Sequence, residues 1–163
     1  MSGQGPVGEP EQAGLGRPDL PHVNAMWAAD EASRALGIEV LQLEVDTAGA
    51  TPVGRARTRM RVTAAMVNGH EIAHGGYIFT LADSTFALAC NATGRLTVAA
   101  GADITYVAAG RLGDVLVATA VERVRYGRSG ITDVTVTRAS DGAVLAEFRG
   151  RSRSLPTPTE VTR

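Results

Sequence analysis

The stretch that decides the fold is GGYIFTLADSTFALACN, residues 75–91. Almost every position in it is apolar or small, and two glycines open it. Asn91 and the nearby Gly94 are typical of a helix end. A helix that is apolar on all sides is a buried helix. A membrane span is the alternative, but the run is too short and carries Asp83 at its middle. We therefore predict a long buried helix here.

The segments around this helix alternate between apolar and polar residues, which is typical of strands with one buried face. Residues 38–46 and 55–67 alternate before the helix, and arginines occupy one face of the second segment. Further strand-like segments follow the helix and are separated by glycine-containing turns; they cover residues 96–108, 114–126, 130–139 and 143–153. Strands clustered after one helix favour an α+β fold with an antiparallel sheet. One sheet covers only part of a helix that is apolar all round, so the remainder predicts a second copy of the chain.

The 163-residue chain is long enough for one domain with a sizeable core, which we expect to cover residues 22–153. Residues 24–36 predict a short amphipathic helix ahead of the strands. Residues 1–21 are rich in glycine and proline and are expected to be disordered, and residues 154–163 are expected to form a flexible tail. The N-terminus has neither a basic start nor an apolar h-region, so no secretory signal is expected and the cytoplasm is the default location.

The composition excludes several kinds of chemistry. All 16 cationic side chains are arginines and lysine is absent, so Schiff-base chemistry and lysine-bearing phosphate loops are excluded. The single cysteine, Cys90, can form neither an internal disulfide nor a multi-cysteine zinc site, and we expect no metal. A formal net charge of −1 gives no reason to expect nucleic acid or an anionic membrane as a partner.

Asp83 is the only charged residue between His74 and Arg95. A carboxylate in a buried helix is costly unless it is hydrogen-bonded, paired or facing a cavity. One interpretation is a structural aspartate that is bonded to Ser84, Thr80 or the backbone. The other is a functional carboxylate, and the loop before the helix supports it.

That loop, residues 68–76, reads NGHEIAHGG. Gly75 and Gly76 either relieve a tight turn or leave the first helical N–H groups open to an anion or a developing oxyanion, which the helix dipole favours. Asn68 and His74 add polar groups nearby. Because Gly75 and Asp83 are about 12 Å apart along a helix, they cannot both reach one carbonyl group. Two antiparallel copies of the helix would bring Asp83 of one chain to Gly75 of the other, so such a site requires a dimer.

The run NGHEIAHGGYIFTLADSTFALACNATG, residues 68–94, resembles the signature of hotdog-fold acyl-CoA thioesterases of the PaaI (phenylacetate-degradation) type. Residues 127–153 resemble the last two strands of that family, so the likeness covers about residues 60–153. The resemblance implies a curved antiparallel sheet wrapped around a long central helix. It also implies a dimer, which in hotdog proteins commonly pairs into a tetramer.

The resemblance further implies hydrolysis of an aryl-acyl-CoA such as (hydroxy)phenylacetyl-CoA, with no cofactor besides the CoA thioester itself. Asp83 matches the catalytic carboxylate of the opposite subunit, acting as general base or as nucleophile. Gly75 matches the oxyanion-binding N–H. Asn68 and His74 match groups that position the thioester or water, although His74 could itself be the base. The expected substrate-binding residues are Gly76, Ser84 and Thr85, the last two through bonds to Asp83 or a water.

The chain departs from this family at three places, of which the first is residues 1–21, a segment without a counterpart in the family. Residues 106–110 read YVAAG where relatives often carry Arg-Pro, and Ala87 stands where a related aryl-CoA branch has a hydroxyl residue. Several arginines on strand faces or ends either pair with acids such as Glu122 and Glu147 or bind the phosphates of CoA. The candidates for the phosphates are Arg123, Arg125, Arg128, Arg149 and Arg151.

Two other functions remain open on the sequence alone. The first is a hotdog dehydratase or hydratase that acts on an acyl thioester, and the second is a non-catalytic acyl-CoA-binding module. The His-Gly-Gly and Ala-Asp pairs fit a hydrolase better than a hydratase. A binding pocket has no need of a buried carboxylate, which disfavours the second alternative.

Overall fold

The computed structural model describes residues 20–156. The segments predicted to be disordered, residues 1–21 and 154–163, lie mostly outside this range; within it, Pro21 begins a helix and Ser154 ends a strand. The elements in chain order are α1 (Pro21–Ala28), α2 (Glu31–Ala35), β1 (Glu39–Asp46), β2 (Val53–Arg61), the 3-10 helix η1 (Ala64–Met66), α3 (Gly75–Asn91), β3 (Thr97–Tyr106), β4 (Val115–Tyr126), β5 (Ser129–Arg138) and β6 (Val144–Ser154).

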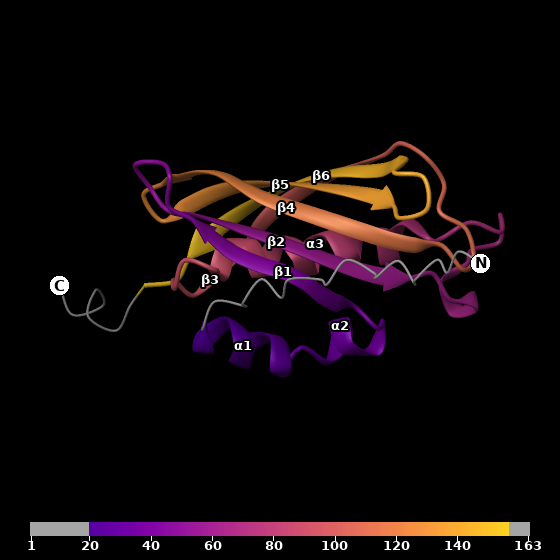
Figure 1. Ribbon diagram of the computed structural model, residues 1–163, viewed down its shortest axis with the longest axis horizontal. Helices are drawn as coiled ribbons and strands as arrows, with labels where there is room; N and C mark the ends of the chain where they lie inside the picture. Colours follow the sequence, from indigo (N-terminus) through magenta and orange to yellow (C-terminus); the bar gives the residue numbers. More distant parts are fainter. Residues whose placement is uncertain (1–19, 157–163) are drawn as a thin grey trace, which may run out of the picture.

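The strands form one six-stranded sheet in the order β1-β2-β4-β5-β6-β3, and every neighbouring pair is antiparallel. Figure 1 shows this sheet curved over one side of α3, with α1 and α2 on the opposite side from the strands. The predicted α+β architecture, with a curved antiparallel sheet wrapped around a long central helix, is therefore confirmed (Figure 1). No helix within residues 20–156 has the length and hydropathy needed to span a bilayer.

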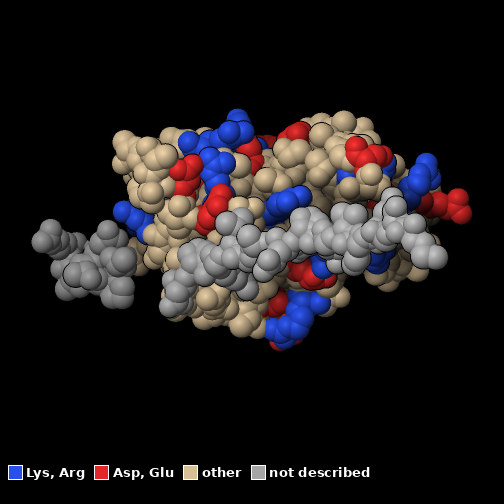
Figure 2. Space-filling model, viewed as in Figure 1, with Lys and Arg blue, Asp and Glu red and all other residues tan. Residues whose placement is uncertain are grey.

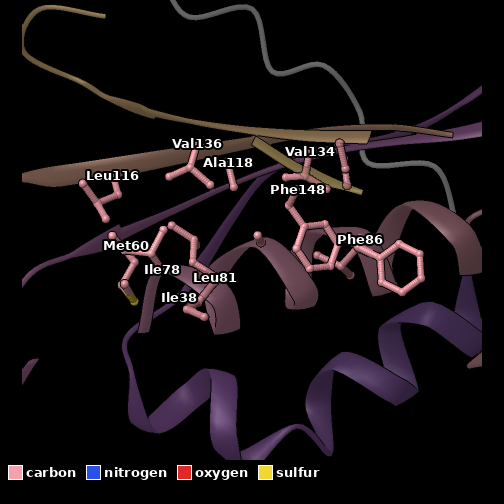
Figure 3. Packing of buried hydrophobic residues seen from close by; sticks show 14 of the residues in the cluster. Ile38, Met60, Ile78, Leu81, Phe86, Leu116, Ala118, Val134, Val136 and Phe148 are labelled. Carbon is pink, nitrogen blue, oxygen red and sulfur yellow. The ribbon is translucent and has the colours of Figure 1, made fainter. Parts of the chain in front are cut away.

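The core lies between α3 and the concave face of the sheet. Leu81 of α3, Leu116 of β4 and Val134 of β5 have no exposed surface. Figure 3 shows these side chains in the layer between the helix and the sheet. Phe86 packs so closely on β6 that a Cβ atom at Gly150 would lie 2.5 Å from its ring. Burying these side chains supplies the main favourable free energy of folding.

The outer face of β2 carries the predicted row of arginines. Arg57, Arg59 and Arg61 are exposed, while the alternating Thr58 and Met60 are buried. Arginines are interspersed with acidic residues in Figure 2, and on this face Arg59 pairs with Glu39 at 2.7 Å. Exposed pairs of this kind contribute little to stability.

Two local predictions differ from the structure. The helix predicted over residues 24–36 is broken into α1 and α2, because Asp30 caps α2 by accepting a hydrogen bond from Ser33 N at 2.9 Å. The strand predicted over residues 55–67 ends at Arg61, after which η1 turns the chain towards the start of α3.

Candidate active site

The loop between η1 and α3 is a small hairpin that fixes the start of the helix. Val67 pairs with Ala73, whose N–H donates to Gly110 O at 2.8 Å, and His74 N donates to Met66 O at 2.8 Å. Glu71 in this loop has φ of 59°, which is uncommon for a residue other than glycine or asparagine. Such strain persists only where surrounding bonds hold the backbone in place, and it is common near functional sites.

Asn68 closes this hairpin with its side-chain oxygen. Asn68 Oδ1 accepts a hydrogen bond from His70 N at 2.9 Å and a longer one from Ile72 N at 3.4 Å. Because the oxygen is engaged, the amide nitrogen Nδ2 is the group that Asn68 offers to a ligand. No acceptor for Nδ2 occurs among residues 20–156.

His74 caps the first turn of α3. Its Nδ1 accepts a hydrogen bond from Gly76 N at 3.0 Å, so in the neutral ring the proton sits on Nε2. The Gly76 N–H, predicted to face substrate, is therefore occupied by the cap. The Gly75 N–H has no acceptor in the described part of the chain, so it is the free donor at this helix start.

Tyr106 covers Gly75 from the end of β3. Its hydroxyl donates to Gly75 O at 2.8 Å, and a Cβ atom at position 75 would lie 2.8 Å from the ring. Gly75 is therefore required by a close approach as well as by the helix start. Sequence reasoning did not identify Tyr106 as a site residue, because the contact joins positions 31 residues apart along the chain.

A hollow of about 400 Å³ opens beside this helix start, and we call it the Tyr106 hollow. Its polar lining comes from Asn68, Gly75 and Tyr106, and its apolar wall includes Ile72, Ile78 and residues 107–109. The departure from the family at YVAAG thus forms a wall of the site. A free N–H at the positive end of a helix, beside an amide donor, can stabilise a developing negative charge.

A second hollow, of about 560 Å³, lies on the other flank of the helix start, and we call it the α2 hollow. Its lining residues are mainly small or apolar: Ala32, Ala35, Leu36, His74, Gly76, Tyr77 and Thr80. Because most of this wall is apolar, the hollow suits an apolar ligand group.

Asp83 is half-buried on the face of α3 opposite the fully buried Leu81 and Thr85. Burial raises its pKa, and the negative charge of Asp30 raises it further. The structural interpretation expected bonds to Ser84 or Thr80. Neither is formed: Ser84 Oγ bonds to Ser33 Oγ, and Thr80 Oγ1 donates to Gly76 O at 2.9 Å. Within the described residues no group donates a hydrogen bond to the Asp83 carboxylate.

The two hydroxyls after Asp83 do not take the roles expected of them. Thr85 has no exposed surface; its Oγ1 lies 2.6 Å from Leu81 O and 2.7 Å from Thr58 Oγ1. It faces the sheet because it lies about 200° around the helix from Asp83. Ser84 faces α2 instead, where it bonds to Ser33 at 2.8 Å.

Most of the candidate arginines are paired with acids. Arg123 and Arg149 share Asp133 at 3.1 and 2.6 Å, and Arg151 pairs with Asp103 at 2.6 Å. Arg128 is exposed beside the β4–β5 turn.

Arg125 has a structural position at the opposite end of α3 from Gly75. It donates to Glu122 at 2.7 Å and to Cys90 O at 2.6 Å. Glu122 is only 1% exposed and also accepts a hydrogen bond from Gly54 N. Glu122 points inward because it continues the alternation of the buried Ala118 and Ala120. Glu147 accepts from Thr135 rather than from an arginine.

One chain therefore brings together only part of the predicted site. Asn68, His74 and Gly75 gather at the helix start, joined by Tyr106. Asp83 lies eight residues further along the same helix, on a face that the sheet does not cover.

Comparison with known proteins identifies this arrangement. The Thioesterase superfamily model matches residues 70–145. Acyl-coenzyme A thioesterase PaaI of Escherichia coli is 37% identical over 134 residues, which span 82% of this chain and 89% of that protein. Human acyl-coenzyme A thioesterase 13 is 31% identical over 130 residues, covering 78% of this chain and 87% of its own length.

Solved structures agree with these matches. The structure of E. coli PaaI, from the phenylacetic acid degradation operon, aligns with a TM-score of 0.75 at 34% identity, covering 83% of this chain and 92% of that one. A mutant structure of the phenylacetic acid degradation protein PaaI of Thermus thermophilus aligns with a TM-score of 0.67 at 32% identity, covering 76% and 97%. The chain thus belongs to the thioesterase superfamily and is a thioester hydrolase, an acyl-CoA thioesterase of the PaaI type.

Proposed function

We propose that this thioesterase acts on aryl-acyl-CoA substrates such as (hydroxy)phenylacetyl-CoA, and that its active site is completed by a second copy of the chain. The observation that carries the proposal is that α3 holds two polar groups without a hydrogen-bond partner among the described residues. One is the free Gly75 N–H beside Asn68, and the other is the Asp83 carboxylate, to which no described residue donates.

In the proposed reaction the Gly75 N–H and the Asn68 amide donate to the thioester oxygen and stabilise it as negative charge develops. Asp83 accepts a proton from water, whose oxygen bonds to the carbonyl carbon; the C–S bond then breaks and the proton passes to the CoA thiolate. Direct attack by the carboxylate, giving a mixed anhydride that water opens, is the other route to the same products. The substrate brings the CoA, and the protein groups named supply the chemistry without a separate cofactor.

The geometry of one chain supports a dimer. Gly75 and Asp83 are about 12 Å apart along α3, too far for both to contact one carbonyl group. The α3 face that carries Asp83 is not covered by the sheet, and β3 is an edge strand that pairs only with β6. An antiparallel partner helix packed alongside α3 would place Asp83 of one subunit near Gly75 of the other, giving two sites per dimer. We propose that two such dimers form a tetramer.

The aryl group is proposed to occupy the α2 hollow. Its volume of about 560 Å³ and its wall of Ala32, Ala35 and Leu36 leave room for a ring, and Tyr77 offers an aromatic surface. The similarity to a protein from a phenylacetic acid degradation operon supports the same class of substrate.

The central test is thiol release from a panel of acyl-CoA esters by wild type and Asp83→Asn. Loss of the carboxylate is expected to lower kcat by about 10²- to 10⁴-fold. Asp141→Asn, in the β5–β6 turn, is the matched control and should keep full activity, because an asparagine oxygen still accepts from Ala143 N. Near-wild-type hydrolysis by Asp83→Asn would contradict the proposed mechanism.

The substrate class is tested by filling the α2 hollow. Ala35→Phe is expected to lower kcat/KM for phenylacetyl-CoA at least tenfold more than for acetyl-CoA. Ala28→Phe, on α1 and outside the hollow, controls for an added ring. Equal effects on both substrates would place the acyl group elsewhere. Hydration of crotonyl-CoA, measured on the same samples, would instead favour the hydratase alternative.

A further inference from the structure

The short N-terminal helices are tied to α3 by a chain of hydrogen bonds. Asp30 accepts from Ser33 N at 2.9 Å and from Ser33 Oγ at 2.6 Å, and Ser33 Oγ lies 2.8 Å from Ser84 Oγ. Because Ser33 gives its hydroxyl proton to Asp30, Ser84 must donate to Ser33. Ser33, the middle residue of this series, is only 1% exposed, while Ser84 and Asp30 are half-buried. Asp30 also caps α2, a role that the side-chain oxygen of an asparagine could fill without the negative charge.

The Ser84 end of this series of hydrogen bonds is adjacent to the candidate base, Asp83. Ser84 directly follows Asp83 in α3, so the two hydrogen bonds that join Asp30 to Ser84 through Ser33 hold the Asp30 carboxylate on the Asp83 side of the helix. The charge of Asp30 accordingly raises the pKa of Asp83, in addition to the larger effect of burial. Among the residues described, no cation pairs with Asp30, and its hydrogen-bond partners are the neutral N–H and hydroxyl groups of Ser33. A negative charge close to a half-buried carboxyl makes that carboxyl harder to ionise, and its carboxylate is then a stronger base.

Other charged groups around Asp83 do not offset this effect. On α2, Glu31 and Arg34 pair with one another, with side chains 80% and 56% exposed, so water screens both. On α1, His22 donates to Asn91 O, at the far end of α3. Two turns along α3, burial raises the pKa of Cys90 to about 12, so this thiol stays neutral.

We propose that Asp30 is a positioning residue for Asp83: held by Ser33 and Ser84, its charge makes Asp83 a stronger base and sets the pH above which the hydrolase works. This inference rests on the proposed role of Asp83. A carboxylate with an ordinary pKa of about 4 is a weak base at neutral pH, and catalysis is most effective when the pKa of the base approaches the working pH. The α1–α2 segment would thus tune the site as well as cover the helix.

The test is Asp30→Asn, which removes the charge but keeps an oxygen that can cap α2 and accept from Ser33. Without the negative charge the Asp83 carboxyl ionises more easily, so its pKa falls. We expect a carbon-detected NMR titration to show the Asp83 midpoint about 0.5 to 1 pH unit lower, with Asp83→Asn used to assign the signal. The acid limb of kcat/KM against pH should move to lower pH by a similar amount.

Glu31→Gln is the matched control, since it removes an exposed charge one residue away and should move neither midpoint nor limb. An unchanged Asp83 midpoint in Asp30→Asn, or an equal shift in Glu31→Gln, would overturn the inference. If Asp83→Asn abolishes thiol release while Asp30→Asn changes nothing, only this inference fails. If Asp83→Asn retains activity, the proposed function fails, and the proposed role of Asp30 fails with it.

Discussion

The two ends of α3 differ in whether their backbone polar groups have hydrogen-bond partners; we call the C-terminal end, where they do, the closed end and the N-terminal end the open end. At the C-terminal end Cys90 O accepts from Arg125 at 2.6 Å and Asn91 O accepts from His22 at 2.8 Å. The Asn91 side chain also bonds both backbone groups of Thr97. At the N-terminal end the Gly75 N–H has no acceptor among residues 20–156, and hollows open on both flanks.

This difference separates structural from functional polar groups on a single helix. Satisfied carbonyls at one end fix the helix to β3, β4 and α1, because a buried polar group without a partner is costly. An open donor at the other end gains its partner only when a ligand binds. The same criterion distinguishes Thr85, whose hydroxyl is bonded in the core, from Asp83, to which no described group donates.

Among the changes at the two ends of α3, Gly75→Ala at the N-terminal end is expected to have the largest effect. The added methyl would meet the Tyr106 ring at 2.8 Å, so the ring or the helix start must move. Displacing the free N–H should lower kcat/KM by about 10²- to 10³-fold, as loss of an oxyanion donor does in other enzymes. Kinetics on the best acyl-CoA of the panel measure the loss.

The double variant Gly75→Ala with Tyr106→Ala relieves that contact and should recover at least tenfold of the lost activity. Tyr106→Ala alone is the control for the ring and its hydrogen bond to Gly75 O. Activity within threefold of wild type for Gly75→Ala would mean that this helix start does not hold the reacting oxygen.

At the closed end, Arg125→Ala should act on stability rather than on catalysis. Glu122 would be left as an unpaired buried carboxylate, which typically costs about 3 kcal/mol. Denaturant unfolding measures the loss, and kcat of the folded enzyme should be unchanged. Arg149→Ala, whose side chain is 56% exposed, is the control and should cost less than about 1 kcal/mol. Unchanged stability with a raised KM for acyl-CoA would instead restore Arg125 as a phosphate ligand.

The sequence predicts the helix α3 and the strands better than the contacts around the N-terminal end of α3. Periodicity located α3 and all six strands, because burial repeats every two residues in a strand and surrounds a central helix. The alternation in β4 also carried the signal that Glu122 faces inward, since it shares the parity of Ala118 and Ala120.

Other features depend on contacts between distant segments. The spacing of Asn68, His74, Gly75 and Asp83 marked the site, but the ring of Tyr106 reaches Gly75 only through tertiary packing. Likewise, Asp30 interrupts the predicted N-terminal helix at the point where Ser33 meets Ser84 across 51 positions. No local pattern encodes these contacts.

The smallest expected effect concerns Cys90, which lies near the closed end and has no exposed surface. Burial, together with the charge of Glu122, raises the thiol pKa to about 12, so below that pH the reactive thiolate is scarce in the folded protein. Iodoacetamide at pH 8 should therefore leave the native enzyme unmodified and fully active, as mass spectrometry and thiol release can measure. Labelling should follow global unfolding, and Arg125→Ala should accelerate it, because the freed Cys90 carbonyl loosens the end of α3. Rapid labelling of the native wild type would show that this end opens independently of the rest of the fold, and the contrast between the two ends of the helix would then be one of degree.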